Sequence, residues 1–551
     1  MLTALILIPL LGALLVALAP VKFTRALATV ITLGALALAV IAAFQFNWTY
    51  PERVWFDQSY TLVEQLGVKL SVGADSVSLL LILLTAFLGP LCVVGSFTAI
   101  TTRVKNYYAW LLVLQAAVTG VFAAQDLMLF YICFEFTLIP LYVLISLYGS
   151  TNRRKAATKF FLYTFTGSVI ALAGLVYVAY AAYEQNLTWS WDIEILRVAA
   201  ASMTRTEQSW VMLAMLAGFA VKVPLFPVHT WLPLAHTEAP TAGSVVLAGV
   251  LLKLGTYAFY KFVLPFTPLA VMTYAPAIAV LAIIGIIYTG LICWAQSDMK
   301  KLVAYSSVSH LGFCVLGLFA VNMVGIQGSI LYMINHGLST GALFFCIGML
   351  YERYHTRSMD EVGGVAVKMP IFAFFLVFFT MASVGLPGLN GFVSEFMCLL
   401  GAFQSGADGP GAVAFGALGP WFAAAAATGM IIAAMYLLYM VGRVLFGPLH
   451  EPAGHHEHEI LPTDLSFREI SVLTPIAALC IVLGVYPTPA LRSLEPPVAQ
   501  VIRGIELAND RAITEAAIAA SPGNTGNAAV ESATSGDTVV FTVIEPDEVA
   551  P

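Results

Sequence analysis

The stretch KVPLFPVHTWLP, residues 222–233, interrupts one long apolar segment of the chain, and GLPGLNGFVSEF, residues 385–396, interrupts another. Proline removes a backbone donor and glycine accepts unusual dihedral angles, so we expect a helix to break at each place. An ionisable side chain accompanies each break, Lys222 at the first and Glu395 at the second. Broken helices at corresponding places in two halves are typical of membrane proteins built from inverted repeats. The two stretches therefore predict two related halves with polar groups inside the membrane.

The composition of the rest of the chain agrees with this class. Of 551 residues, 60% are hydrophobic and only 10% are charged, and the mean hydropathy is +0.88. These values lie outside the range of soluble globular proteins. Apolar runs of about 20 residues recur along the chain, which is enough to cross ~30 Å of hydrocarbon as a helix and too long for barrel strands. The net charge of -6 comes without any basic block, so nothing indicates nucleic-acid binding.

We expect an all-α polytopic membrane protein with about 14 transmembrane helices. Two inverted five-helix repeats, formed by spans four to eight and nine to thirteen, would each contain one broken helix. Opposite orientation of the two repeats follows because five is an odd number. The expected spans are approximately 3–19, 22–45, 74–99, 106–124, 126–148, 156–184, 209–237 (broken), 241–263, 271–294, 302–321, 324–351, 370–404 (broken), 418–446 and 468–486.

The basic residues are unevenly divided between the two sets of loops. Fifteen lysines and arginines follow odd-numbered spans and five follow even-numbered ones. Because cytoplasmic loops collect Lys and Arg, we expect both termini on the outer side of the membrane. Residues 46–73, with alternating apolar side chains, predict a small hairpin on that outer face.

The chain divides into five expected units. They are 1–105 (helices one to three with the outer hairpin), 106–263 (first repeat), 271–447 (second repeat), 448–486 (cytoplasmic loop and last helix) and 487–551 (outer tail). We expect the tail to be peripheral and partly disordered, with a short helix around 497–519 and a β-prone stretch, TVVFTVIEP. The N-terminus has no positive flank before its apolar run, which favours a retained first helix over a cleaved signal peptide.

Several ionisable side chains lie deep inside the apolar spans, where a charge costs roughly 2.5–3.5 kcal/mol. Glu135 lies about nine residues into its span, roughly 14 Å along a helix, so its short side chain cannot reach the surface. It is a proton carrier, the counter-ion to one, or a carboxylate fixed in a static ion pair. Lys222, just before its break, becomes a two-state proton site if Glu135 moves closer or farther, and a static pair of the two is the alternative.

Lys253 lies midway along its span with no carboxylate near it in sequence. We expect it to release its proton easily, unless it extends toward the surface. Lys261, nearer the helix end, fits that second behaviour better. His310 and His336 are either proton relays or satisfied core residues, and Glu395 is the natural terminus of a relay. Hydroxyl and amide side chains nearby favour a wet interior: Ser306, Ser307, Ser309, Asn335, Ser339 and Thr340.

The cluster HEPAGHHEHE, residues 450–459, lacks the spacing of a metal-ligand set and reads as a solvated loop. His229 and His236 either line a proton inlet or cap a helix end. Seven cysteines without a CxxC pair read as small core residues. We find no sequence motif for a phosphate-binding loop, a haem or another redox centre, and we expect neither a cofactor nor a metal in this chain.

Three stretches resemble a known family. They are FAVKVPLFPVHTWLPLAHTEAPTAGSVVLAGVLLKLGTYAFYKF (219–262), SDMKKLVAYSSVSHLGF (297–313) and INHGLSTGALFF (334–345). They are similar to the antiporter-like subunits of respiratory complex I and of Mrp-type cation/proton antiporters, over roughly residues 70–450. Glutamate at 395 resembles one complex I type, because the L and N types and the Mrp subunits usually carry lysine there. The tail after Pro487 is longer than the family pattern.

The resemblance implies a proton-translocating subunit of NADH:quinone oxidoreductase, with an Mrp-type Na⁺/H⁺ antiporter subunit as the alternative. Glu135 and Lys222 would form the coupling pair, Lys253 with His310 and His336 the relay, and Glu395 the exit site. FMN, iron–sulfur clusters and quinone would be bound by partner subunits. The implied partners are flanking antiporter-like subunits of the L and N types, the lateral helix of L, and the lipid bilayer. The implied location is the bacterial inner membrane.

Overall fold

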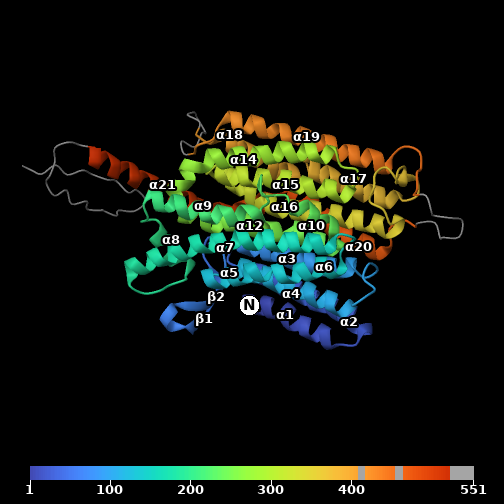
Figure 1. Ribbon diagram of the computed structural model, residues 1–551, viewed down its shortest axis with the longest axis horizontal. Helices are drawn as coiled ribbons and strands as arrows, with labels where there is room; N and C mark the ends of the chain where they lie inside the picture. Colours follow the sequence, from blue (N-terminus) through green and yellow to red (C-terminus); the bar gives the residue numbers. More distant parts are fainter. Residues whose placement is uncertain (407–415, 453–462, 521–551) are drawn as a thin grey trace, which may run out of the picture.

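The computed structural model describes residues 1–406, 416–452 and 463–520. Within them the chain is almost entirely helical, and the helices run roughly side by side along the long axis of the molecule (Figure 1). Eleven helices are long and apolar enough to cross a membrane, and the shorter apolar helices α1 (Leu2–Leu18) and α17 (Pro370–Val384) accompany them. The expectation of a polytopic helical membrane protein is therefore confirmed.

The helices follow the expected apolar segments closely. The fifth expected span continues through α5 and α6, which meet at Thr137. Thr137 keeps helical angles (φ -60°, ψ -25°), so the span is one helix with a local irregularity that the sequence analysis did not predict. The first part of the chain forms α2 (Val21–Gln45), α3 (Ser76–Gly95), α4 (Val104–Ala123), α5 (Leu127–Phe136), α6 (Leu138–Tyr148), α7 (Arg153–Asn186) and α8 (Ile193–Ala200). The second part forms α14 (Pro268–Trp294), α15 (Met299–Phe319), α16 (Met323–Tyr354), α19 (Pro420–Leu445), α20 (Phe467–Val485) and α21 (Thr488–Ala520).

Both expected helix breaks are present. α9 (Arg205–Lys222) ends at Lys222, and α10 (Leu232–Glu238) resumes after the proline-containing loop. The indole Nε1 of Trp231 donates to the carbonyl oxygen of Val221 at 2.9 Å, which satisfies one of the carbonyls freed by the break. The second break separates α17 from α18 (Asn390–Gln404), where Gly385 has φ of 84°, a conformation that favours glycine.

The segment after α10 alternates between α-helical and π-helical turns. It consists of α11 (Thr241–Val246), the π-helical turn η2 (Leu247–Leu251), α12 (Leu252–Ala258), the π-helical turn η3 (Phe259–Val263) and α13 (Leu264–Phe266). This segment and α16 are completely buried over their most apolar windows, whereas only 28% of the corresponding window of α2 is buried. The centre of the molecule therefore consists of these two elements and α15.

One end of the molecule carries the non-helical elements. Strands β1 (Trp55–Val63) and β2 (Val68–Ala74) pair antiparallel, as expected for residues 46–73, and gather with α8 and α21 at the left of Figure 1. Gly67 makes the turn between the strands with φ of 62°.

The first part of the tail is longer and better packed than expected. α21 extends from Thr488 to Ala520, and its side chains Leu494, Val498 and Ile505 are at most 1% exposed. The stretch TVVFTVIEP lies outside the described residues.

Candidate functional site

Glu135 and Lys222 come from α5 and from the end of α9. Lys222 is 2% exposed, its Nζ lies 3.3 Å from Oγ1 of Thr137, and it lies 4.3 Å from the centroid of the Phe134 ring. The carboxylate oxygens of Glu135 are buried and have no hydrogen-bond partner among the described residues. The two charges are neighbours without forming an ion pair in this conformation. A static ion pair, one of the two alternatives from the sequence, is thus not the arrangement seen here.

Lys253 lies at the centre of the molecule with 0% exposure. Its Nζ lies 2.7 Å from Nδ1 of His336 on α16 and also donates to the carbonyl oxygen of Ala248 in the π-helical turn η2. The side chain therefore points toward the core and does not extend to a surface. No carboxylate pairs with it in the part of the chain that the structure describes, so its proton is balanced by dipoles alone.

His310, Tyr332 and Glu395 form a compact group on α15, α16 and α18. Nδ1 of His310 lies 2.9 Å from Oε1 of Glu395 and 2.7 Å from the hydroxyl of Tyr332, which also donates to Glu395. All three side chains are at most 3% exposed. A buried carboxylate held by a phenol and an imidazole is equipped to accept and release a proton.

The Lys253 pair and the Glu395 group lie next to each other. The rings of His336 and His310 have centroids 5.8 Å apart, and Nε2 of each ring makes no hydrogen bond to any described residue. A buried line of titratable side chains, called the central line below, is thus formed by Lys253, His336, His310, Tyr332 and Glu395. Sequence reasoning missed Tyr332, although its spacing of four residues from His336 places both on one helix face.

Polar contacts hold the second break in register with the central line. Nδ2 of Asn335 donates to the carbonyl oxygen of Asn390 at 2.7 Å and lies 3.0 Å from Oγ of Ser394, and Nδ2 of Asn390 donates back to the carbonyl oxygen of Asn335 at 3.1 Å. These bonds fix the start of α18 against α16. They therefore determine where Glu395 lies.

The serines and threonine expected to make the interior wet are mostly bonded to helix carbonyls. Ser306 donates to Val303 at 2.8 Å, Ser309 to Ile286 at 2.9 Å and Ser339 to Asn335 at 3.1 Å. The line of titratable side chains, and not the hydroxyls, is therefore the continuous polar feature of the core.

Lys222 approaches the central line through a close helix contact. A side chain at Gly255 would place its Cβ 2.9 Å from the backbone nitrogen of Val223, so only glycine lets α12 lie this near the first break. The structure brings Glu135 and Lys222 together as one pair and the remaining candidates together as the central line. No hydrogen bond between the two groups is present among the described residues.

His236 and Lys300 are further buried groups that belong neither to the Glu135–Lys222 pair nor to the central line. His236 is stacked on Phe344 with centroids 4.6 Å apart, and neither ring nitrogen has a partner among the described residues. Lys300, which the sequence analysis did not single out, is 7% exposed and donates to the carbonyl oxygen of Ala239 at 2.5 Å. His229 lies beside Phe226, with ring centroids 5.8 Å apart.

The histidine-rich stretch lies mostly outside the described residues, which include only its start. There Oε1 of Glu451 pairs with Lys368 at 2.7 Å, and the backbone of His450 pairs with that of Gly363. Across the ranges that the structure describes, no group of three or more His, Cys, Asp or Glu side chains could hold a metal ion.

Fold and site together define a polytopic membrane protein with a line of titratable side chains in its interior. The model of the family described as NADH:quinone oxidoreductase/Mrp antiporter, TM, matches residues 124–417. NADH-quinone oxidoreductase subunit M of Rhodobacter capsulatus is 42% identical over 445 residues, covering 80% of this chain and 83% of that protein. NADH-ubiquinone oxidoreductase chain 4 of Marchantia polymorpha is 38% identical, covering 91% and 97%. The chain belongs to the NADH:quinone oxidoreductase/Mrp antiporter family of transmembrane subunits.

Solved structures agree with this assignment. A chain of respiratory complex I from Thermus thermophilus superposes with a TM-score of 0.80 at 29% identity, covering 92% of this chain and 100% of that one. A chain of the Mrp complex from Dietzia sp. superposes with a TM-score of 0.74 at 21% identity, which shows a shared fold alone.

Proposed function

We propose that this chain is a proton-translocating membrane subunit of NADH:quinone oxidoreductase, of the subunit M type. The central line is the observation that carries the proposal. Five buried titratable side chains that follow one another in space would have no role in a protein that only anchors a complex in the membrane. The identity to subunit M and chain 4 relatives supports complex I over an Mrp-type antiporter subunit, for which the likeness rests on fold alone.

The coupling step belongs to Glu135 and Lys222. Glu135 is half-buried, and its neighbours Ile132 and Phe136 on α5 are 55% and 39% exposed, so this face is open to an adjacent subunit. A charge arriving there attracts or repels the carboxylate and changes its distance to Lys222. Because an opposite charge stabilises an ammonium, moving Glu135 away favours release of a proton from Lys222.

Over a full cycle, proton transfer along the central line returns each side chain to its starting protonation state. Lys253 gives a proton to Nδ1 of His336, and His336 passes a proton from Nε2 to His310, directly or through one water. His310 and the Tyr332 hydroxyl deliver it to the Glu395 carboxylate. Lys253 is then reprotonated from the Lys222 side, Glu395 releases its proton to the outer side, and both imidazoles return to their starting tautomers. Each cycle therefore moves one proton.

The energy for pumping comes from electron transfer elsewhere in the complex. Moving one charge against the membrane potential costs ~2.3 kcal/mol per 100 mV, which quinone reduction in partner subunits supplies. FMN, iron–sulfur clusters and quinone are bound by partner subunits. Flanking subunits of the L and N types, with the lateral helix of L, cover the lateral faces.

The architecture we propose is an inverted repeat of residues 106–263 and 271–447 within fourteen spans. Glu135 on α5 and Lys222 on α9 have counterparts in His310 on α15 and Glu395 on α18, each pair placing one group on a second span and one at a broken helix. The loop charges support both termini on the outer side of a bacterial inner membrane.

The experiment has two parts. The assembly is first purified through a tag on this chain, and the gene for this chain is then deleted. Co-purification of NADH dehydrogenase subunits with flavin and iron–sulfur absorbance supports the proposal, and deletion should lower proton pumping per NADH oxidised. If only other antiporter subunits are recovered, the chain belongs to an Mrp-type assembly and not to complex I.

A further inference from the structure

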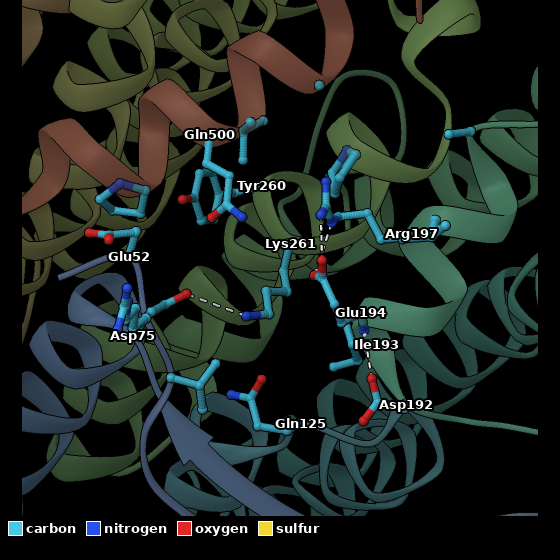
Figure 2. A pocket seen from close by; sticks show the side chains of 18 of the residues that line it. Glu52, Asp75, Gln125, Asp192, Ile193, Glu194, Arg197, Tyr260, Lys261 and Gln500 are labelled. Atoms are coloured by element: carbon cyan, nitrogen blue, oxygen red, sulfur yellow. Dashed lines mark hydrogen bonds and ion pairs between the residues drawn. The ribbon is translucent and has the colours of Figure 1, made fainter. Parts of the chain in front are cut away.

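A cavity of about 940 Å³ lies at the end of the molecule that carries the β-hairpin. Its walls come from the hairpin, α8, η3 and α21, and Figure 2 shows their side chains pointing into it. Charges of both signs line it, including Asp57, Lys69, Asp192 and Arg197. It is large and polar enough to hold water. Such a mixed, roomy lining suits water and protons better than an apolar ligand or a single anion.

The inner end of this cavity carries an ion pair. Nζ of Lys261 lies 3.3 Å from Oδ2 of Asp75, and the two side chains are only 13% and 9% exposed (Figure 2). Asp75 also accepts the backbone N–H of Ser78 at 2.8 Å, so it caps α3 while it holds the lysine. Lys261 therefore does not extend freely into solvent as the sequence suggested.

Two other groups face Lys261. Glu194 of α8 lies across the cavity and is paired with Arg197, and Tyr257 lies one turn back along the same buried segment. If the Asp75 bond breaks, Glu194 offers the ammonium a second carboxylate. Lys261 can thus pair either with Asp75 or with Glu194.

Tyr257 connects this pair with the centre of the molecule. It is 1% exposed, and its hydroxyl lies 2.9 Å from Oγ of Ser78. Asp75 binds the backbone N–H of that serine and not its hydroxyl. Lys253, Tyr257 and Lys261 follow each other at intervals of four residues, which places them along one side of the helix. A titratable side chain thus occurs at each turn from the central line to the cavity.

We propose that the Lys261–Asp75 pair is a gate between the central line and outer water, with Tyr257 as the relay behind it. The proposal rests on proton transfer through Lys253, whose proton takes this route instead of the one through His336. Nζ of Lys253, which contacts Ala248 and His336 in this structure, turns to give one proton to the phenol oxygen of Tyr257, one helical turn away. The Tyr257 hydroxyl proton passes to Oγ of Ser78, and the Ser78 hydroxyl turns to give its own proton to the Asp75 carboxylate. Asp75, once neutral, releases Lys261 toward Glu194 and then gives the proton to water in the cavity.

The balance of this sequence is one proton lost by Lys253 and one gained by water. Tyr257, Ser78 and Asp75 return to their starting protonation, and Lys261 remains charged throughout. While the gate is closed, the ammonium of Lys261 repels an incoming proton and keeps the route from leaking. The merely structural alternative is a static ion pair that anchors η3 to the cap of α3.

The test is passive proton leak through the whole complex, reconstituted in vesicles and measured as the decay of an imposed pH gradient without NADH. Lys261→Met removes the repelling charge, and we expect the leak to rise at least about tenfold, the scale on which charged clefts alter rates. Tyr257→Phe added to Lys261→Met should restore a tight vesicle, because the relay is cut. A tight Lys261→Met vesicle, or a leak that survives Tyr257→Phe, overturns the gate.

The matched control is Tyr107→Phe added to Lys261→Met. Tyr107 is also 1% exposed, and its hydroxyl also lies 2.9 Å from a serine, Ser96, just after α3. This variant loses an equivalent hydrogen bond away from the route, so the leak should persist. If Tyr107→Phe closes the leak as well as Tyr257→Phe does, the relay role is refuted.

A second measurement covers the case in which Lys261→Met fails to assemble. Ser78→Cys, with the gate intact, is treated with a membrane-impermeant cationic methanethiosulfonate from either side of the vesicle. Labelling that occurs from the cavity side and only during NADH turnover supports the gate. Labelling that is the same at rest and in turnover, or absent in both, contradicts it.

The proposed function can fail separately from the gate. If Lys253→Met pumps normally, proton transfer through Lys253 is wrong. If Lys253→Met loses pumping while Lys261→Met vesicles stay tight, only the gate is wrong.

Discussion

Replacing Tyr332 by phenylalanine tests the central line at the point where Tyr332 contacts both His310 and Glu395. The ring and its packing stay, while the hydroxyl that contacts both Nδ1 of His310 and the Glu395 carboxylate disappears. A hydrogen bond to a charged group contributes roughly 1.5–3 kcal/mol. If Tyr332 bridges His310 and Glu395 during transfer, loss of a contribution of this size slows transfer about 10- to 100-fold, since 1.4 kcal/mol is a factor of ten.

The assay is NADH-driven acidification in vesicles containing the purified complex, with quinone reduction measured in parallel. We expect coupled pumping to fall by that factor while flavin and iron–sulfur absorbance stay unchanged. Tyr107→Phe serves as control, because it also removes a buried tyrosine hydroxyl with a 2.9 Å partner, far from the line. Pumping by Tyr332→Phe at the rate of this control would refute the role of the Tyr332 hydroxyl.

Substitutions at three further positions test other parts of the mechanism and the fold. Glu135→Gln keeps the shape and removes the charge that acts on Lys222, so pumping should fall severely while native gels show normal assembly; unchanged pumping would remove Glu135 from the path. Glu395→Lys should retain some pumping, since both residues titrate, whereas Glu395→Ala should lose more; the reverse order would make Glu395 a packing residue. Burial raises the pKa of Asp126, which caps α5, from its ordinary 3.8 to about 6. The folded state therefore holds a proton between these pH values that the unfolded state has released, and wild-type stability declines as pH rises through that window. Asp126→Asn keeps the cap, so its melting temperature should vary less between pH 4 and 7, and an equal decline in both proteins would contradict the burial effect.

The sequence predicted the helical segments well because apolar length is a local property. The breaks at 222–233 and 385–396 were predictable for the same reason, since Pro224 and Gly385 act on their own backbone. The irregularity at Thr137 has a local signal that the sequence analysis did not use, because Pro140 in α6 has no N–H to donate to the carbonyl of Phe136.

Partners across the core could not be predicted in the same way. His310 and Glu395 are 85 positions apart, and Lys253 and His336 are 83 apart, so only the packing of α12, α15, α16 and α18 shows that they meet. The Lys261–Asp75 pair joins η3 to the cap of α3 across 186 positions, which is why Lys261 looked like a free surface lysine from its own span. Sequence reasoning thus found which groups are buried, and the fold showed which of them touch.

The most direct test of the central claim is the number of protons pumped per electron in Lys253→Met and Lys253→Arg. Arginine keeps the positive charge and does not release its proton, whereas methionine removes both charge and proton. If Lys253 exchanges protons, both variants assemble with their redox partners and both lose most of the pumped protons. If Lys253→Arg pumps like the wild type, a fixed charge suffices and the central line is not a proton path.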